Sequence, residues 1–251
     1  QAGLVPALEP HGHALGIKEV VKLDAGRIED RFALEPGEGA ARLFLGDVTA
    51  GMVGGGFLYT NEDTLSIGVV LSLEDVGGRP PDAAGTHEIM EAFTQRAELR
   101  PLLQGSELVE YSAHLIPEPR ADRLPPRIAS GLLLAGDAAG LVINHGITVR
   151  GMDLALVSGV LAARAIVHAR QAGDYSASTL AEYDRLLSES FVVKDIERHA
   201  HMPEFLERRR LYEVYPAAVC GVLEDLFRVG PDGKERLYPP AWKGLRGSIA
   251  N

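Results

Sequence analysis

One stretch decides how the chain folds: IASGLLLAGDAAGLVINHGITVRGMDLALVSG, residues 128–159. It opens with residues 128–135, an apolar run that predicts a strand buried on both faces, because polar residues do not alternate within it. The run leads into Gly136 and Asp137, and a second small-residue turn follows at Gly146. A helix is expected from about residue 152 to 171, ended by Gly173. The sequence therefore predicts a strand, a turn and a helix with little side-chain bulk between them.

This layout suits a ligand that passes within contact distance of the backbone. The carboxylate of Asp137, expected at the end of the strand, can accept hydrogen bonds from sugar-type hydroxyl groups. A helix mouth expected just beyond Gly146 would offer unpaired amide groups and the positive end of a helix dipole. A flavin has both needs, because it carries a polyol chain and a ring that gains negative charge on reduction. The alternative is an ordinary connection in which Asp137 only caps a turn.

Three short motifs within this stretch resemble those of a known protein family. GDAAG at residues 136–140, NHG at 144–146 and TVRGMD at 148–153 resemble the carboxy-terminal flavin motif of the FixC-type electron transfer flavoprotein–quinone oxidoreductases. Three further stretches are similar to that family's substrate domain: GIKEV at 16–20, GGGFLYTNEDTLSIGV at 54–69 and YSAHLIPE at 111–118. The family's amino-terminal Rossmann unit has no counterpart, since residues 37–42 lack the third glycine of the fingerprint. Proline and arginine at residues 119–120 also replace the glycines that often follow Pro-Glu in the family.

The resemblance implies an FAD-dependent oxidoreductase that takes electrons from an electron transfer flavoprotein and passes them to a quinone or a ferredoxin-like acceptor. It also brings the link to nitrogen fixation that FixC carries. Asp137 would hold the ribityl chain, and the backbone around residues 146–148 would lie against the flavin ring. The cofactor-binding residues implied are Gly136, Asp137, Ala138, Gly140, Asn144, His145, Gly146, Ile147 and Thr148. Gly54, Gly55, Gly56 and Tyr59 would face the substrate or acceptor, and no catalytic residue is assigned.

Two other functions stay open. One is a geranylgeranyl-reductase-like FAD enzyme acting on isoprenoid double bonds, which would need an apolar tunnel over residues 54–59. The other is a non-catalytic interaction fragment. At the level of residues, the triple glycine also fits a bulge at a sheet edge, and Tyr59 also fits a core aromatic. Arg150 and Asp153 also fit a simple ion pair at a helix start.

Composition narrows the classes of protein. The 251 residues carry a net charge of -10, which argues against a nucleic-acid footprint and against an anionic membrane surface, although a local apolar patch can touch lipid. The only cysteine, Cys220, cannot supply an iron–sulfur cluster, so a cluster relay would be a separate ferredoxin-like protein. The pairs His11/His13 and His199/His201 lack further ligands at metal-site spacing, so no metal is expected.

We expect a cytoplasmic protein, with peripheral contact at the inner face of the membrane as the second option. The lone cysteine fits a reducing compartment. The longest apolar run, residues 131–143, is interrupted by Asp137 and is too short to span a bilayer. The chain starts at Gln1 with neither methionine nor a basic-then-apolar leader, so we expect a fragment or a processed piece without a signal peptide.

The remaining pattern predicts an α+β fold, a piece of an α/β flavoprotein, with a mixed β-sheet. Strands are expected at residues 14–23, 41–45 and 107–116, and a hairpin is expected from residues 56–60 and 64–73. A loop at residues 76–85, a helix from Thr86 as N-cap to Leu99, and a mostly helical tail over residues 176–227 complete the pattern. We divide the chain into a mixed-sheet, substrate-facing region 1–127, a flavin-binding strand–turn–helix 128–172, and a helical region 173–251.

Overall fold

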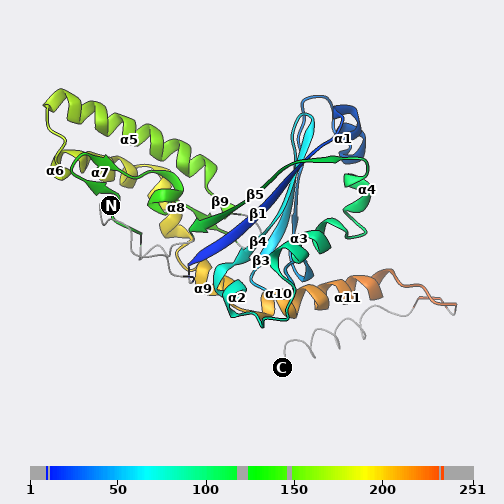
Figure 1. Cartoon of the computed structure of the whole chain (residues 1–251). Coiled ribbons are helices and arrows are strands. Elements are labelled where there is room, and N and C mark those ends of the chain that lie inside the picture. The colour runs from blue at the N-terminus through cyan, green and yellow to red at the C-terminus, as the bar shows by residue number, and fades with distance from the viewer. Residues whose placement is uncertain (1–9, 11, 118–123, 146–148, 232, 235–251) are drawn as a thin grey trace. The chain divides into compact units, whose positions relative to one another are not determined.

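The computed structural model describes residues 10, 12–117, 124–145, 149–231 and 233–234 (Figure 1). The chain forms two compact units that interleave along the sequence. Unit 1 comprises Gln1–Ile17, Leu71–Pro81 and Ser112–Phe205, and unit 2 comprises Lys18–Val70, Asp82–Tyr111 and Leu206–Asn251. The motif at residues 136–153 therefore lies in unit 1, and the triple glycine lies in unit 2.

A five-stranded sheet, most of it in unit 2, has the strand order β2-β3-β4-β1-β5. Its strands are β1 (His13–Lys22), β2 (Ala41–Phe44), β3 (Gly54–Thr60), β4 (Thr64–Ser72) and β5 (Glu107–Pro117). Strands β2 and β3 run antiparallel, with Phe44 opposite Gly56. Lys22 at the end of β1 pairs with Asp63 just before β4, at 3.5 Å, as antiparallel neighbours do. The sheet is antiparallel, so the expected mixed sheet is wrong, whereas the expected strands are confirmed.

The hairpin of β3 and β4 is confirmed together with its polar turn. The Asn61 amide N–H donates to the carbonyl of Thr64 at 2.8 Å, and the Asn61 side-chain amide donates to the Thr64 hydroxyl at 3.0 Å. A short polar side chain that closes the turn on itself explains why this link reverses the chain within three residues. The turn fixes the register of the two central strands.

One face of the sheet in unit 2 is covered by α3 (Thr86–Thr94) and α4 (Arg100–Leu103). Alternate side chains of β4, such as Leu65 and Ile67, are fully buried, as the strand period requires. From α3, Phe93 reaches β2 and packs edge-on against Phe44, with ring centroids 5.2 Å apart. Arg31 at the end of α1 (Ala25–Phe32) donates to the carbonyl of Leu102 at 2.8 Å and so ties α4 down.

Two predictions for the helices before β5 are wrong. The helix expected over residues 86–99 ends early, because α3 stops at Thr94. A separate short helix, α4, follows beyond the predicted range and carries Pro101 in its first turn, where proline is tolerated. Its N-cap is Gly85, whose amide donates to the Glu88 carboxylate at 2.7 Å. The loop expected at residues 76–85 begins late, because α2 (Leu73–Gly78) runs into it. The Ser72 hydroxyl accepts from the Asp75 amide at 3.3 Å and starts that helix.

Unit 1 is built around α5 (Met152–Ala172), α6 (Ala177–Leu180), α7 (Glu182–Glu189) and α8 (Phe191–Arg198). The inner face of α5 packs with α7 and α8 through fully buried side chains that include Leu154, Tyr183 and Val192. Gly173 ends α5 in the left-handed region, as predicted, with φ of 66°.

The remaining described elements of the two units are η1 (Asp47–Thr49), η3 (Gly136–Ala139), β6 (Ile128–Ala129), β7 (Leu132–Leu133), β8 (Ile143–Asn144), β9 (Val149–Arg150), α9 (Met202–Leu206), α10 (Arg210–Glu213) and α11 (Tyr215–Phe227). The helical tail is confirmed.

The buried strand predicted over residues 128–135 is wrong. Residues Ile128–Ala129 and Leu132–Leu133 pair with each other as a small antiparallel hairpin. Gly131 lies in the left-handed region with φ of 75°, and its amide donates to the carbonyl of Tyr175 at 2.8 Å. The glycine therefore turns the chain in the middle of the apolar run, and Asp137 follows a hairpin instead of a long strand.

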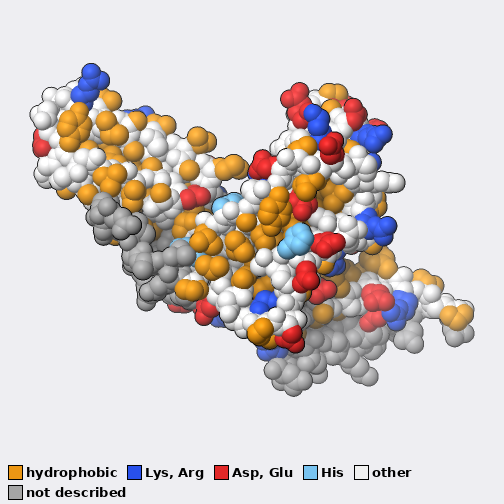
Figure 2. All heavy atoms as spheres, viewed as in Figure 1, with side chains coloured by type: hydrophobic (Ala, Val, Ile, Leu, Met, Phe, Trp, Pro, Cys, Tyr) orange, Lys and Arg blue, Asp and Glu red, His pale blue; other side chains and the backbone are white. Residues whose placement is uncertain are grey.

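Helix α5 is apolar on both sides. Its 21 residues include a window of mean hydropathy 1.5, so its length and composition would allow it to cross a membrane, yet a core helix passes the same test. Opposite the buried residues run exposed apolar side chains: Met152 at 86% exposure, Leu156 at 73% and Val160 at 55%. Figure 2 shows hydrophobic side chains along this helix. A helix with apolar side chains on two opposite faces is normally covered on both of them.

Candidate flavin-binding turn

The turn at Gly136 is held against α5 by its backbone. The Gly136 amide donates to the hydroxyl of Ser158, a fully buried residue on α5, at 2.9 Å. Gly136 has φ of +60°, and a Cβ there would lie 3.1 Å from the Cβ of Ala155. Glycine is thus required both by its backbone conformation and by the closeness of the helix. Ser158 escaped the sequence analysis, although a single serine inside an apolar helix is a usable signal.

Asp137 is exposed on the next position of the same turn, η3. The turn closes when the Gly140 amide donates to the carbonyl of Asp137 at 2.9 Å, with Gly140 in the left-handed region. The Asp137 Oδ1 atom lies 3.4 Å from the place where a Cβ on Gly151 would stand. Its carboxylate therefore lies beside the N-cap of α5. Ala138 is exposed and Ala139 is buried, so only Asp137 offers a charged group on this turn.

The helix expected from about residue 152 is confirmed, but the helix mouth expected just beyond Gly146 lies further along the chain. Helix α5 begins at Met152 with Gly151 as N-cap, and the short strand β9 separates it from Gly146. The expected helix N-terminus just beyond Gly146 is therefore wrong. Gly146, Ile147 and Thr148 lie outside the described residues, and their contact with a flavin ring stays a prediction. Asn144 lies on β8, opposite Val149 of β9.

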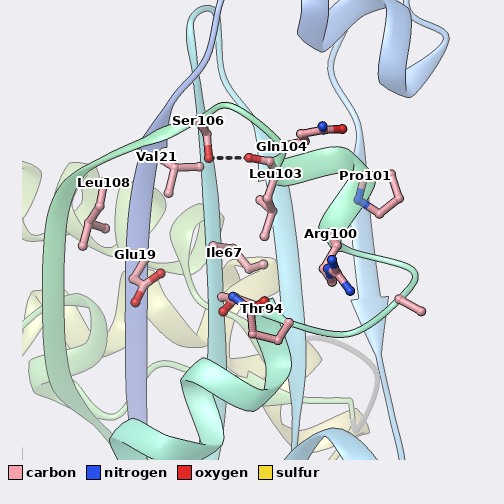
Figure 3. Close-up of a pocket in the computed structure, with 12 residues that line it drawn as sticks. Glu19, Val21, Ile67, Thr94, Arg100, Pro101, Leu103, Gln104, Ser106 and Leu108 are labelled. Carbon is pink, nitrogen blue, oxygen red and sulfur yellow. Dashed lines mark hydrogen bonds between the residues drawn. The ribbon is translucent and has the colours of Figure 1, made fainter.

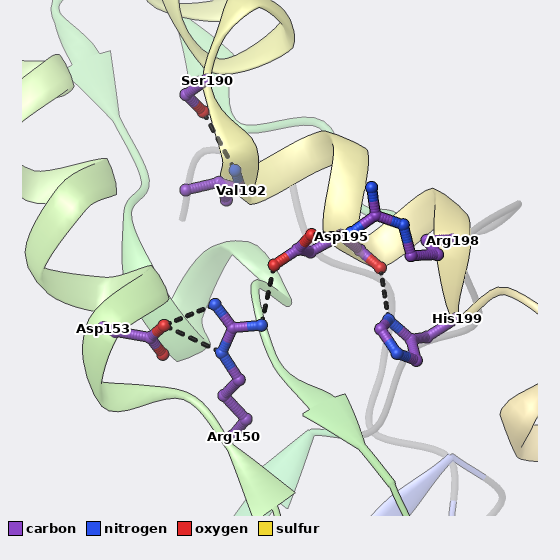
Figure 4. Close-up of polar contacts among 7 residues, drawn as sticks. All are labelled: Arg150, Asp153, Ser190, Val192, Asp195, Arg198 and His199. Atoms are coloured by element: carbon purple, nitrogen blue, oxygen red, sulfur yellow. Dashed lines mark hydrogen bonds and ion pairs between the residues drawn. The ribbon is translucent and has the colours of Figure 1, made fainter.

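Arg150 links the start of α5 to α8 (Figure 4). Its Nη2 lies 2.6 Å from Oδ2 of Asp153, and its Nη1 lies 2.7 Å from Oδ2 of Asp195. Hydrogen bonds to the two carboxylates raise the pKa of Arg150, and the guanidinium lowers the pKa of both Asp153 and Asp195. The expected ion pair of Arg150 and Asp153 is confirmed. Asp195 was not foreseen, because it lies 45 residues away in sequence.

His145 lies just before residues 146–148 of the motif, and its ring lies against that of His199, at the C-terminal end of α8. The ring centroids of His145 and His199 are 4.5 Å apart. Burial, followed by the nearby charge of His199, lowers the pKa of His145. Its Nε2 atom is buried and has no hydrogen-bond partner within the described part of the chain. This orphaned nitrogen is a group that a bound ligand could satisfy.

The triple glycine in unit 2 has a packing explanation at two of its positions. A Cβ on Gly55 would lie 2.8 Å from the carbonyl oxygen of Phe44, and a Cβ on Gly56 would lie 2.5 Å from Cζ of Phe93. Strand β3 is flanked by β2 and β4, so these glycines are not a bulge at a sheet edge. Gly54 has φ of 150°. Gly55 and Gly56 therefore allow β2 and α3 to pack closely against β3.

Tyr59 is not a core aromatic. It is 38% exposed and stacks on Phe57 with ring centroids 5.1 Å apart. Leu58, which lies between these two aromatic residues in β3, is fully buried. Because successive side chains of a strand point to opposite faces, Phe57 and Tyr59 lie on the face of the sheet away from α3. Partial burial raises the pKa of the Tyr59 phenol. An aromatic pair on this face remains available to a substrate or acceptor.

A separate hollow of about 680 Å³ lies in unit 2 on the helix-covered side of the sheet (Figure 3). Glu19 of β1, Arg100 of α4 and Gln104 give it polar groups, while Val21 and Leu103 supply apolar walls. Burial raises the pKa of Glu19, and the charge of His87 partly opposes this. None of the residues implied for the cofactor lines it. In the described ranges, no group of three or more histidines, cysteines, aspartates or glutamates is placed to hold a metal ion.

A glycine turn that presents an exposed carboxylate beside the start of a long helix can hold a polyol-bearing cofactor. The curated proteins that the chain resembles include electron transfer flavoprotein-quinone oxidoreductases by name. The chain is 42% identical over 232 residues to the probable electron transfer flavoprotein-quinone oxidoreductase YdiS of Escherichia coli strain K12. The matched region covers 92% of this chain and 53% of that protein. It is 41% identical to Protein FixC of the same strain, over 93% of this chain and 54% of that protein. The resemblance to the FixC-type family is confirmed, and the chain spans about half the length of these relatives.

Other comparisons are weaker. No protein-family model matches the chain. Among solved structures, the flavin-dependent halogenase CmlS is 15% identical, covers 95% of this chain and 44% of its own, and has a TM-score of 0.43. The flavin-dependent brominase Bmp2 is 15% identical and has a TM-score of 0.45 over 87% of this chain and 56% of its own.

Proposed function

We propose that the chain is the flavin-closing, substrate-facing half of an FAD-dependent oxidoreductase that carries electrons from an electron transfer flavoprotein to a quinone or a ferredoxin-like acceptor. The observation that carries the proposal is the sequence identity of about 40% to FixC-type proteins across nearly the whole chain. The exposed carboxylate of Asp137 supports the proposal, because it can accept hydrogen bonds from the hydroxyl groups of the cofactor.

The residues present fit one side of an FAD molecule. Asp137 would accept hydrogen bonds from the ribityl hydroxyl groups, and Gly136 lets the turn lie directly on α5. The unpartnered Nε2 of His145 offers a hydrogen bond to a polar edge of the ring. Ala138, Gly140, Asn144 and residues 146–148 complete the proposed contact surface. When bound, FAD would supply the redox chemistry, and this chain would orient it and limit its exposure to water.

One structural feature supports a larger partner half. The outer stripe of α5, defined as Met152, Leu156, Val160 and Val167, exposes more than half of each side chain. The matching relatives are nearly twice as long as this chain, so part of their length has no counterpart here. We propose that this additional half, a dinucleotide-binding unit, covers the outer stripe. An apolar surface of this kind on a water-facing helix is otherwise unfavourable.

The partners and location follow from the same proposal. Cys220 is the only cysteine, so an iron–sulfur acceptor would be a separate ferredoxin-like protein. Phe57 and Tyr59, on the face of the sheet away from α3, are the aromatic pair best placed for a quinone ring in unit 2. We place the protein in the cytoplasm, with contact at the inner face of the membrane as the alternative.

Flavin absorbance tests the proposal. The 251-residue chain and the full-length encoded protein are each purified, mixed with FAD and dialysed. A flavin that binds with micromolar affinity or better stays bound through dialysis. Each sample is then scanned from about 350 to about 500 nm, where a protein-bound flavin absorbs. We expect a retained flavin in the full-length protein that is reduced by a reduced electron transfer flavoprotein and reoxidised by a water-soluble quinone. Full-length protein that retains no flavin would refute the proposal. Flavin that is retained but not reduced by that donor would refute the electron source.

A further inference from the structure

Helix α8 is firmly anchored in unit 1. Its apolar face places Val192 and Ile196 in the same buried cluster as Leu154 of α5 and Leu187 of α7. The helix starts with the Ser190 hydroxyl accepting from the Val192 amide at 3.1 Å. The other face of α8 turns Asp195, with a side chain 16% exposed, toward the segment that carries the flavin motif. A rigid helix thus presents a charged group to that segment.

The first contact fixes Arg150. Asp195 accepts from Arg150 Nη1 through one oxygen and from Arg198 Nη1 through the other, at 2.7 and 2.9 Å. The Nε of Arg150 also donates to Asp153 at 2.8 Å, and the Phe191 ring lies 5.6 Å from its guanidinium carbon. Three groups from two helices therefore hold the Arg150 side chain, and a planar guanidinium bound on several edges has little rotational freedom.

The second contact fixes His145. Its ring lies against His199, which follows the last residue of α8, and the His199 Nδ1 lies 2.8 Å from the carbonyl oxygen of Asp195. One turn of α8 thereby touches both His145 and Arg150. These two residues bracket residues 146–148, the part of the motif that the family resemblance sets against the flavin ring.

We infer that Asp195 and His199 are positioning residues that clamp the flavin-binding segment at its two ends, with Asp195 acting through Arg150 and His199 acting through His145. The inference rests on the proposed function. It assigns a role to the helical region beyond residue 173, which the sequence alone left as a tail. The clamp explains why Arg150 has two acidic partners, since Asp153 alone would hold it only to the start of α5.

The test uses the full-length, FAD-loaded protein with Asp195→Asn and His199→Ala. The matched controls are Glu189→Gln, at an exposed position of α7 that also pairs with an arginine, and His168→Ala, at an exposed position of α5. We expect each clamp variant to weaken FAD binding by roughly fivefold or more, and each control by less than about twofold. Asp195→Asn should add nothing to Arg150→Gln, because the two act as one unit, and Asp195→Glu should restore most of the affinity.

A second readout does not need the flavin. In the 251-residue chain, the His145 ring is titrated by NMR. The charge of Asp195 raises the pKa of His145 and that of His199 lowers it, so Asp195→Asn should lower this pKa and His199→Ala should raise it. Arg150 is the other charged group acting on His145 and is left in place. A general loosening of the fold would move both variants in one direction.

The outcomes separate the two claims. If wild-type full-length protein holds no FAD, the proposed function fails, and the NMR titration alone decides whether the clamp contacts exist. If wild type holds FAD and Asp195→Asn binds it as well as Glu189→Gln does, the clamp is refuted and the proposed function stands. Opposite shifts of the His145 pKa with weakened FAD binding support both.

Discussion

Gly56→Ala is the substitution whose cost follows most directly from the structure. The new Cβ would stand 2.5 Å from Cζ of Phe93, whereas ordinary contact begins at 3.4 Å, so an atom must move by about 0.9 Å. Phe93 is 1% exposed, so its ring is enclosed by other residues of the core. Overpacking of this kind costs about 1–3 kcal/mol, and replacing glycine in a strand returns about 0.4–1 kcal/mol of it through the unfolded chain. We expect a net loss of about 1–2 kcal/mol, or about 3–6 °C in Tm for a chain of this length.

Urea unfolding of the 251-residue chain measures this loss. Gly77→Ala is the control, because nothing lies within 4 Å of its new Cβ. Its free energy of unfolding should equal that of wild type or rise by up to about 1 kcal/mol, since alanine is the better helix former in α2. In a Phe93→Leu background the Gly56→Ala penalty should shrink by about 1 kcal/mol, since the shorter side chain leaves room. Equal stability of Gly56→Ala and Gly77→Ala would refute the account that Phe93 occupies the side-chain space of Gly56.

Three further predictions test other parts of the molecule. Glu19→Gln should stabilise unit 2 at pH 7 and give no advantage below pH 4.5, the ordinary pKa of a glutamate. Burial raises the pKa of Glu19 in the folded state, so the stability of the wild type is fully present below the unfolded-state pKa and is lost as the pH rises through the folded-state pKa. Urea titrations at three pH values check this, with Glu62→Gln as control, and an advantage at every pH would contradict it. Leu156→Ser, at a position 73% exposed, should leave the Tm of the 251-residue chain within about 2 °C but destabilise the full-length protein by about 1 kcal/mol or more. Equal effects at both lengths would mean that nothing covers the outer stripe. Ser158→Ala should cost about 1–3 kcal/mol by leaving the Gly136 amide without its buried acceptor, and unchanged thermal unfolding would contradict that contact.

Local signals predicted the strands of the sheet well. Two apolar runs joined by the polar link that starts at Asn61 made the hairpin visible, and Gly173 marked the end of α5. The failure at residues 128–135 has a local cause as well, because Gly131 adopts a positive φ and turns an apolar run into a hairpin. A continuous apolar run cannot by itself distinguish a buried strand from two short ones that pair with each other.

The site was predicted in part, since its residues come from distant segments. Gly136 and Asp137 were singled out because the motif that contains them is contiguous in sequence, and their contact with FAD stays a prediction. The partner of Arg150 on α8 and the serine that holds the Gly136 amide lie 45 and 22 residues away from their contacts. No periodicity reports which of several acidic residues on a helix faces another helix. Packing decides that, and the sequence of one chain does not display it.

The central claim is that the Asp137 carboxylate grips the ribityl chain of FAD. Its most direct test is the Kd of FAD for full-length protein with Asp137→Ala, measured by flavin fluorescence next to Asp82→Ala, an exposed aspartate in unit 2. The account predicts that the Kd rises at least about tenfold for Asp137→Ala, about 1.4 kcal/mol, and stays unchanged for the control. An Asp137→Ala protein that keeps its flavin through dialysis as well as wild type does would contradict the account.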